Sequence, residues 1–148
     1  AYLKNLDNIF YDVKNDRVVF LVRYKNKIVD AVGRRLGNYG SKWHRYNKSK
    51  IPFTIGEGEV TIVVEDCASA CAVTDWYKGV ALMGTHLTNE ALTLLSDSLN
   101  VVVALDKDAT RKAIDMVMRL KSKVPTRLVT LDRDLKVLTK DEIWKILK

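Results

Sequence analysis

A five-residue apolar run that ends in two acidic residues limits the folds open to this chain. Residues 101–105 read Val-Val-Val-Ala-Leu and are followed by Asp106 and Asp108. A continuous β-branched run is typical of a strand buried on both faces, as in a parallel sheet covered by helices. Open α/β sheets place their chemistry beyond the carboxyl ends of such strands. The run therefore predicts a parallel sheet with a functional site near Asp106.

Two further predicted strands also end in acidic residues. Residues 61–64 lead to Glu65, and residues 127–131 lead to Asp132 and Asp134. Carboxylates gathered at one sheet edge repel one another unless a cation compensates them, and such oxygen ligands suit Mg²⁺ or Mn²⁺. Residues two apart in an extended chain point the same way, so Asp106 and Asp108 are expected to ligate one cation.

Other interpretations of these acids stay open at this point. Strand-end aspartates are commonly helix N-caps, and Asp108 stands ahead of a predicted helix over residues 109–122. A phosphorylated-aspartate receiver domain also carries acids at strand ends. It fits less well, because it needs a paired acidic site early in the chain and has no basic lobe.

Strands and helices alternate from about residue 54 onwards, which favours right-handed crossovers and a parallel sheet. Periodicity predicts strands at 61–65, 79–83, 100–105 and 127–131, and helices near 66–77, 88–98, 109–122 and 139–147. Thr88 and Thr139 are the expected N-caps of the second and fourth helices. Before residue 54, the pattern predicts antiparallel strands at 17–22 and 28–34 joined by a turn at 24–27, then a loop over 36–51. Residues 1–16 show apolar side chains at helical spacing.

The positive charge of the chain is concentrated in one segment. The whole chain has a formal net charge of +7, while residues 23–50 alone carry +8, with Asp30 as their only acid. The basic residues of this segment are Arg23, Lys25, Lys27, Arg34, Arg35, Lys42, Arg45, Lys48 and Lys50. Aromatic residues such as Trp43 lie among them, and their rings can stack on bases. The segment is either a solvated lysine-rich surface or, as the rings favour, a nucleic-acid contact beside the acidic site.

Composition excludes several classes of protein. At 148 residues with 47% hydrophobic content, the chain can bury a core, and no stretch approaches the roughly 18 apolar residues of a membrane span. We expect neither a signal peptide nor a zinc site, because Cys67, Cys71 and two distant histidines do not form a ligand set. The two cysteines are expected to be small buried hydrophobes on one helix face in a reducing cytoplasm.

Several motifs together resemble those of one family. A glutamate after the first strand and Asp-x-Asp after the third is similar to the Toprim signature of primases, topoisomerases and some nucleases. Gly84-Thr85-His86-Leu87-Thr88 resembles the Gly-Thr-x-Leu-Thr loop of bacterial and phage DNA primases, and residues 41–46 resemble their Pro-Lys-Tyr element. Residues 18–34 are similar to the segment that precedes Toprim in the primase RNA-polymerase domain. The resemblance spans roughly residues 17–120.

The resemblance implies a division of the chain and a fold class. We expect a small basic N-terminal lobe of antiparallel strands at residues 1–53, followed at residues 54–148 by a Toprim-like α/β domain whose parallel sheet is flanked by helices. Several positions depart from the family pattern: Ala109-Thr110 stands where Ala-Gly often follows Asp-x-Asp, and residues 132–135 resemble the third acidic motif only loosely. Where primases have glycine after the glutamate and an aspartate four residues after it, this chain has Asp66 and Ser69.

The resemblance also implies roles for individual residues. Asp106 and Asp108 would be direct ligands of Mg²⁺ or Mn²⁺, and Asp134, with Asp132 as the alternative, would serve a second metal. Glu65 would be a ligand or the catalytic base. The residues implied in contacts with nucleotide or DNA are Arg34, Lys42, Arg45, Gly84, Thr85 and Lys107.

The implied activity is synthesis of short RNA primers on single-stranded DNA from nucleoside triphosphates. Expected partners are the template and the nucleotides, with a replicative helicase or a separate zinc-binding module in addition, and no membrane. The expected location is the cytoplasm of a bacterium or a phage-infected host. Two alternatives remain: a Toprim nuclease, in which water replaces the 3′-hydroxyl as the nucleophile, and a non-catalytic nucleic-acid or protein-binding module.

Overall fold

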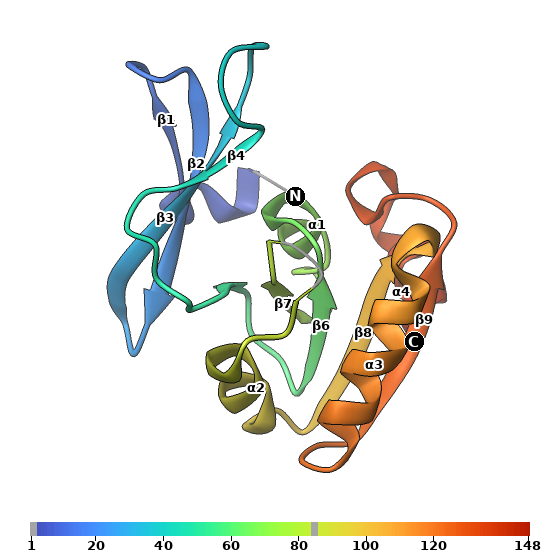
Figure 1. The fold of residues 1–148 in the computed structure, drawn as a ribbon. Helices are drawn as coiled ribbons and strands as arrows, with labels where there is room; N and C mark the ends of the chain where they lie inside the picture. Colours follow the sequence, from blue (N-terminus) through green and yellow to red (C-terminus); the bar gives the residue numbers. More distant parts are fainter. Residues whose placement is uncertain (1–2, 84–85) are drawn as a thin grey trace.

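The computed structural model describes residues 3–83 and 86–148, which form two sheets with helices packed around the second (Figure 1). The first sheet is antiparallel and follows a short 3-10 helix, η1 (Leu3–Asn8). Its strands in spatial order are β1 (Ile9–Asp12), β2 (Arg17–Tyr24), β3 (Lys27–Arg35) and β4 (Trp43–Arg45). Lys25 and Asn26 join β2 to β3 with φ angles of 50° and 63°, as a two-residue hairpin turn requires.

The second sheet is parallel except at one edge, and its strand order is β5-β7-β6-β8-β9. Its strands are β5 (Phe53–Ile55), β6 (Val60–Val64), β7 (Lys78–Ala81), β8 (Asn100–Asp106) and β9 (Thr126–Leu131). Only β5 runs antiparallel to its neighbour. The connecting elements are α1 (Cys67–Ala72), α2 (Asn89–Ser96), η2 (Lys107–Ala109), α3 (Thr110–Lys121), η3 (Leu135–Val137) and α4 (Lys140–Leu147). The predicted fold class is confirmed.

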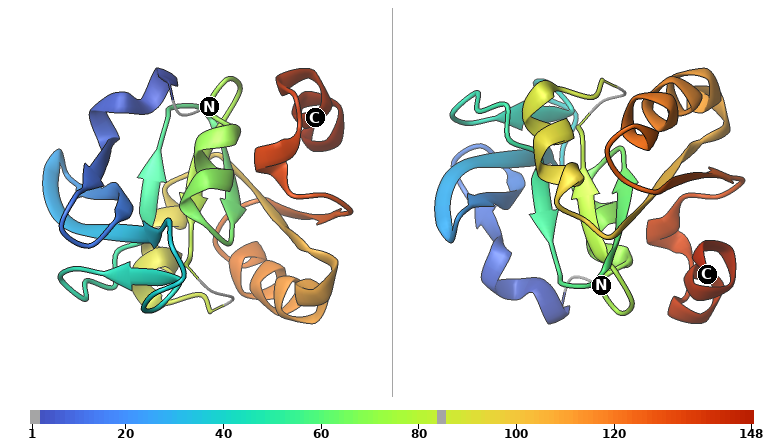
Figure 2. Two further views of the ribbon diagram at one scale, coloured as in Figure 1. Left: turned by 90° about the horizontal axis from the view of Figure 1, so that it is seen from above. Right: turned by 90° about the horizontal axis from the view of Figure 1, so that it is seen from below.

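Helices cover both faces of the second sheet, as a buried parallel sheet demands. Ile62 and Val64 point to the face where α1 and α4 pack, whereas Val63 points to the face covered by α2 and α3 (Figure 2). All three side chains are at most 1% exposed. This two-sided burial explains why the strands read as continuous apolar runs in the sequence.

The two sheets share one apolar core. Phe20 of β2 meets Phe53 of β5 edge to face, with ring centroids 5.6 Å apart, and both are fully buried. The same cluster continues to Cys71 of α1 and Leu147 of α4. The first sheet ends at Arg45 and the second begins with β5; whether residues 1–53 and 54–148 are separate domains stays a prediction.

Most predicted elements exist, and the differences lie at their ends and among the short strands. Ile9 and Phe10 pair with β2 instead of extending a helix, because the hairpin edge satisfies their backbone groups. The predicted loop over 36–51 contains β4, and β5 was not predicted. The predicted helix 66–77 ends at Ala72. Thr88 and Thr139 are the N-caps, and Thr139 forms a capping box with Glu142.

Helix α1 lies against β7 at a position that leaves no room for a side chain. A Cβ atom on Gly79 would come within 2.3 Å of the carbonyl oxygen of Ala70. The close approach buries Cys67 and Cys71 against the sheet, as their helical spacing predicted. It also fixes the N-terminal end of α1 beside the carboxyl ends of the parallel strands. No helix in the described part of the chain is long and apolar enough to cross a membrane.

We predict that Gly79→Ala destabilises the fold by about 1–3 kcal/mol, because the added methyl forces α1 away from β7. The free energy of unfolding from urea titration measures this change. Gly37→Ala is the matched control: its Cβ would meet nothing closer than 3.5 Å, and its stability should stay within about 0.5 kcal/mol of wild type. Equal stability of the two variants would contradict the tight packing of α1.

Candidate active site

Three acidic residues predicted from the sequence meet at the carboxyl edge of the parallel sheet. Glu65 follows β6, Asp106 ends β8 and Asp134 follows β9, and these three strands are neighbours. The three side chains line one small cavity of about 20 Å³, together with Asp66 and Ser69. Parallel pairing therefore gathers carboxylates that are up to 69 positions apart in the sequence.

Asp108 lies beside this cavity rather than in it. The chain turns into η2 directly after Asp106, so the two aspartates do not continue one extended strand. Both border a second, open hollow of about 290 Å³ that Asp132 and Asp134 also line. Lys107 forms an ion pair with Asp132 at the rim of this hollow, and both side chains are largely exposed. Joint ligation of a cation by Asp106 and Asp108 stays a prediction.

Asp66 is a member of the site that sequence reasoning did not assign. It is the N-cap of α1, where its Oδ1 accepts a hydrogen bond of 2.9 Å from the backbone N–H of Ser69. Its Oδ2 accepts one of 3.0 Å from the Lys136 ammonium. An aspartate directly after a strand-end glutamate and ahead of a helix was the available signal, because a capping residue is held at the sheet edge.

Ser69 and Lys136 hold Asp134 in place. The Ser69 hydroxyl donates to Asp134 Oδ1 at 3.0 Å, and the Lys136 backbone N–H donates to the same oxygen at 3.3 Å. The Lys136 ammonium lies 2.7 Å from Asp134 Oδ2. These contacts outweigh the effect of burial and lower the pKa of Asp134.

The pKa values of Glu65 and Asp106 are shifted in the opposite direction. Burial, followed by the nearby charge of Asp106, raises the pKa of Glu65. Burial and the charge of Asp134 likewise raise the pKa of Asp106. Lys136 forms ion pairs with Asp66 and Asp134, whereas Glu65 and Asp106 form none among the described residues. Raised carboxylate pKa values in a cleft are a feature of functional sites.

The donor set suits a hard divalent cation. Carboxylate oxygens are the protein ligands that Mg²⁺ and Mn²⁺ prefer, and a cavity of about 20 Å³ is close to the volume of a single small guest. Across residues 3–83 and 86–148, no three side chains already converge into a complete metal shell. Glu65 and Asp106 are the residues that would hold the ion first, because the other two carboxylates already share the Lys136 ammonium.

An inter-sheet cavity, lined by apolar side chains as well as by Arg34 and Trp43, lies between the first sheet and the α1 and η3 segments that follow strands of the second. This cavity has a volume of about 460 Å³, and Arg34, Trp43 and Lys136 are among its lining residues. The Arg34 guanidinium lies over the Trp43 ring at 5.6 Å. Because Lys136 also contacts Asp66 and Asp134, the inter-sheet cavity borders the acidic site directly.

The other predicted nucleotide contacts have different surroundings. Lys42 is exposed on the loop before β4. Arg45 donates to Asp30 Oδ2 at 3.0 Å and to the Ile51 carbonyl at 2.9 Å, so its guanidinium is engaged within the lobe. Gly84 and Thr85 lie outside the described residues.

Asp30 organises the loop that carries much of the basic charge. Its side chain is fully buried and accepts hydrogen bonds of 2.7 Å from the backbone N–H groups of Ala31, Asn47 and Ser49. Together with the Arg45 ion pair, these bonds fix residues 46–51 against β3. The only acid of the basic segment therefore has a structural role that its charge alone did not reveal.

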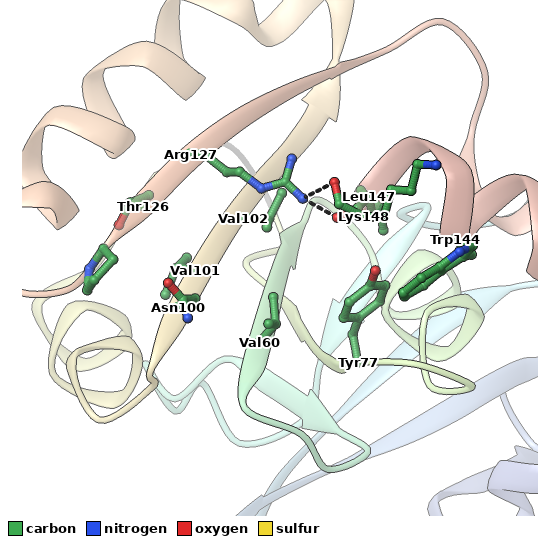
Figure 3. Close-up of a pocket in the computed structure, with 11 residues that line it drawn as sticks. Val60, Tyr77, Asn100, Val101, Val102, Thr126, Arg127, Trp144, Leu147 and Lys148 are labelled. Carbon is green, nitrogen blue, oxygen red and sulfur yellow. Dashed lines mark hydrogen bonds between the residues drawn. The ribbon is translucent and has the colours of Figure 1, made fainter.

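A cavity of about 450 Å³ lies at the opposite edge of the sheet, where the parallel strands begin (Figure 3). Val60, Val102 and Trp144 line it, and no carboxylate is among its lining side chains. Arg127 donates to the carbonyls of Leu147 and Lys148 at its rim. The acidic chemistry is therefore confined to the carboxyl edge.

Comparison with solved structures identifies the fold. The chain superimposes on the DnaG catalytic core with a TM-score of 0.69 and 21% identity, over 97% of this chain and 56% of that one. For the Escherichia coli primase catalytic core, the TM-score is 0.69 and the identity 21%, over 95% of this chain and 55% of that one. For a DNA primase domain from Pseudomonas aeruginosa, the TM-score is 0.66 and the identity 18%, over 95% of this chain and 55% of that one. No family model and no curated protein matches the sequence.

The fold and the acidic edge together define an α/β protein with the architecture of DNA primase catalytic cores. The structural match confirms the primase-core resemblance at the level of the fold. The chain spans a little over half the length of each matched core.

We predict that Glu65→Gln stabilises the metal-free protein at neutral pH by up to about 1 kcal/mol, or about 2–4 °C in Tm. The folded-state pKa of Glu65 is raised, so its stabilising contribution is present below the unfolded pKa and is lost as pH rises through the folded pKa. Glutamine does not ionise, so the Glu65→Gln variant keeps its stability as the pH rises. Thermal melts in EDTA at neutral and acidic pH measure it, and the gain should vanish in acid. Glu57→Gln, in an exposed loop, is the control and should melt like wild type at both pH values.

Proposed function

We propose that this chain acts as a DNA primase catalytic core, which joins nucleoside triphosphates into short RNA primers on single-stranded DNA. The observation that carries the proposal is the meeting of Glu65, Asp106 and Asp134 at one edge of a sheet with the primase-core fold. The basic lobe ahead of this sheet supports polymerisation over hydrolysis, because a polymerase has to hold a template and a triphosphate together.

In this proposal, Glu65 and Asp106 hold a magnesium or manganese ion, with Asp108 completing the set from the adjacent hollow. When bound, the ion compensates the phosphate charge and favours the deprotonated 3′-hydroxyl. As the alternative to ligation, Glu65 would be the base that accepts the proton of that hydroxyl; burial raises its pKa in the metal-free site, which favours proton acceptance. Asp134 stays a candidate ligand of a second ion.

The inter-sheet cavity is the proposed path of the nucleotide and template. Arg34 offers a forked guanidinium for phosphate oxygens, and Trp43 offers a ring on which a base can stack. Lys42 and Lys107 extend the positive surface on the two sides of the acidic cluster. Arg45 contributes indirectly, because it holds the loop that carries Lys48 and Lys50.

The proposed partners follow from this reaction. They are single-stranded DNA and nucleoside triphosphates, with a replicative helicase or a separate zinc-binding module as further components of priming. The proposed location is the cytoplasm of a bacterium or a phage-infected host, where replicating DNA is found.

We predict that the chain incorporates labelled nucleoside triphosphates into oligoribonucleotides on single-stranded DNA with Mg²⁺ or Mn²⁺. Asp106→Asn should lower the rate at least about a hundredfold, because it removes a charge that acts at the reacting phosphate. Asp115→Asn, on the exposed side of α3, is the matched control and should retain the wild-type rate.

The products separate the possible outcomes. Shortened DNA, lost in Asp106→Asn, would replace the primase proposal with a Toprim nuclease. If neither product forms and Asp106→Asn leaves DNA binding and metal-dependent stability unchanged, the catalytic proposal is wrong and a binding module is the remaining function.

We predict that Lys42→Ala weakens binding of single-stranded DNA and reduces the slope of log affinity against log salt by about 0.7, the value for one lost phosphate contact. Fluorescence anisotropy at several salt concentrations measures the slope. Lys123→Ala, at the opposite edge of the sheet, removes the same charge and should leave the slope unchanged. Equal slopes for the two variants would remove Lys42 from the DNA contact.

A further inference from the structure

Lys136 places a positive charge inside the acidic cluster. Its ammonium lies 2.7 Å from Asp134 Oδ2 and 3.0 Å from Asp66 Oδ2, and so joins the end of β9 to the start of α1. The Asp66 and Asp134 side chains are only 20% and 34% exposed, so solvent screens these pairs less than it screens a surface pair. The contact is a cation held between two carboxylates, which is the arrangement that a metal ion takes in such a site.

The backbone of Lys136 is held next to both acids. Lys136 belongs to η3, whose neighbouring residue Leu135 is fully buried in the core. Its backbone N–H donates to Asp134, and Asp66 is held in turn by the N-terminal turn of α1. These contacts hold the backbone of Lys136 and the Asp66 carboxylate close enough for the ammonium to bridge the two acids.

The bonds at Asp134 use most of the capacity of this carboxylate. One oxygen accepts from the Ser69 hydroxyl and from the Lys136 backbone, and the other faces the Lys136 ammonium. A metal ion at Asp134 would have to share Oδ2 with the Lys136 ammonium or displace one of these partners. Among the described residues, Glu65 and Asp106 form no ion pair.

The size of the acidic cavity points the same way. Two metal ions in a phosphoryl-transfer site stand about 3.5–4 Å apart. The acidic cavity, at about 20 Å³, accommodates one small guest and not such a pair.

We propose that Lys136 is a built-in cation of this site: it occupies the place between Asp66 and Asp134, and the site takes a single divalent ion at Glu65 and Asp106. The inference rests on the proposed function, because that function supplies the divalent ion. It assigns Asp66, which stands where primases have glycine, to holding the ammonium, and it replaces the second metal expected at Asp134.

The test counts bound Mn²⁺ by equilibrium dialysis with EPR detection of the free ion. Wild type should bind one ion per chain, and Lys136→Met should bind two, because the freed carboxylates of Asp66 and Asp134 become ligands. Lys136→Arg keeps the charge and should bind one. Lys121→Met is the matched control: it removes the same charge from the exposed last turn of α3, away from the acidic cluster, and should bind one.

The outcomes distinguish this inference from the proposed function. Two ions in wild type, or one in both wild type and Lys136→Met, would overturn the role of Lys136 and leave the metal site intact. No ion in either protein would overturn both proposals. Two ions in Lys136→Met and one in wild type would support the role of Lys136 even if no primers are made.

A measurement on wild type covers the case in which Lys136→Met fails to fold. Acylation of the Lys136 amine, followed by mass spectrometry, should be equally slow with and without Mn²⁺, because the single ion binds elsewhere in the cavity. Faster acylation on addition of Mn²⁺ would show that the metal displaces the ammonium, and would overturn the inference.

Discussion

The fold of this protein has to overcome electrostatic repulsion among carboxylates. Parallel pairing of β6, β8 and β9 gathers Glu65, Asp106 and Asp134 at one edge, and the N-cap of α1 adds Asp66. No local interaction would bring these residues together, since their charges oppose it. The apolar strands behind them are buried on both faces, and that burial holds the acids in place.

The first sheet depends on the same core but solves a different electrostatic problem. Its basic segment would repel itself, yet one buried acid, Asp30, collects three backbone N–H groups and the Arg45 guanidinium. These donors, one of them charged, compensate the burial of the carboxylate. The molecule therefore places one buried acid among the bases of the first sheet, and the Lys136 ammonium between two acids beside the second.

The sequence predicted the regular part of the fold well, because long apolar runs and helix caps are local signals. The strands that lead to Glu65 and Asp106 and the caps at Thr88 and Thr139 are of this kind. Strand β5 is only three residues long and is defined by its neighbour β7, so periodicity over a window did not find it. The residues of the candidate site were likewise predicted only where the signal was local. Strand-end acids were predicted, whereas the bridge from Lys136 to Asp66 was not, since it depends on how η3 packs on α1.

The close approach of α1 to β7 limits which substitutions position 79 can accept during evolution. The atom that a side chain at Gly79 would meet is the carbonyl oxygen of Ala70, which belongs to the backbone. Every amino acid has this carbonyl oxygen, so no substitution at position 70 would relieve the clash that a side chain at Gly79 creates. Because α1 also carries Asp66 and Ser69, relatives that lose this glycine would have to rebuild the acidic edge together with the helix.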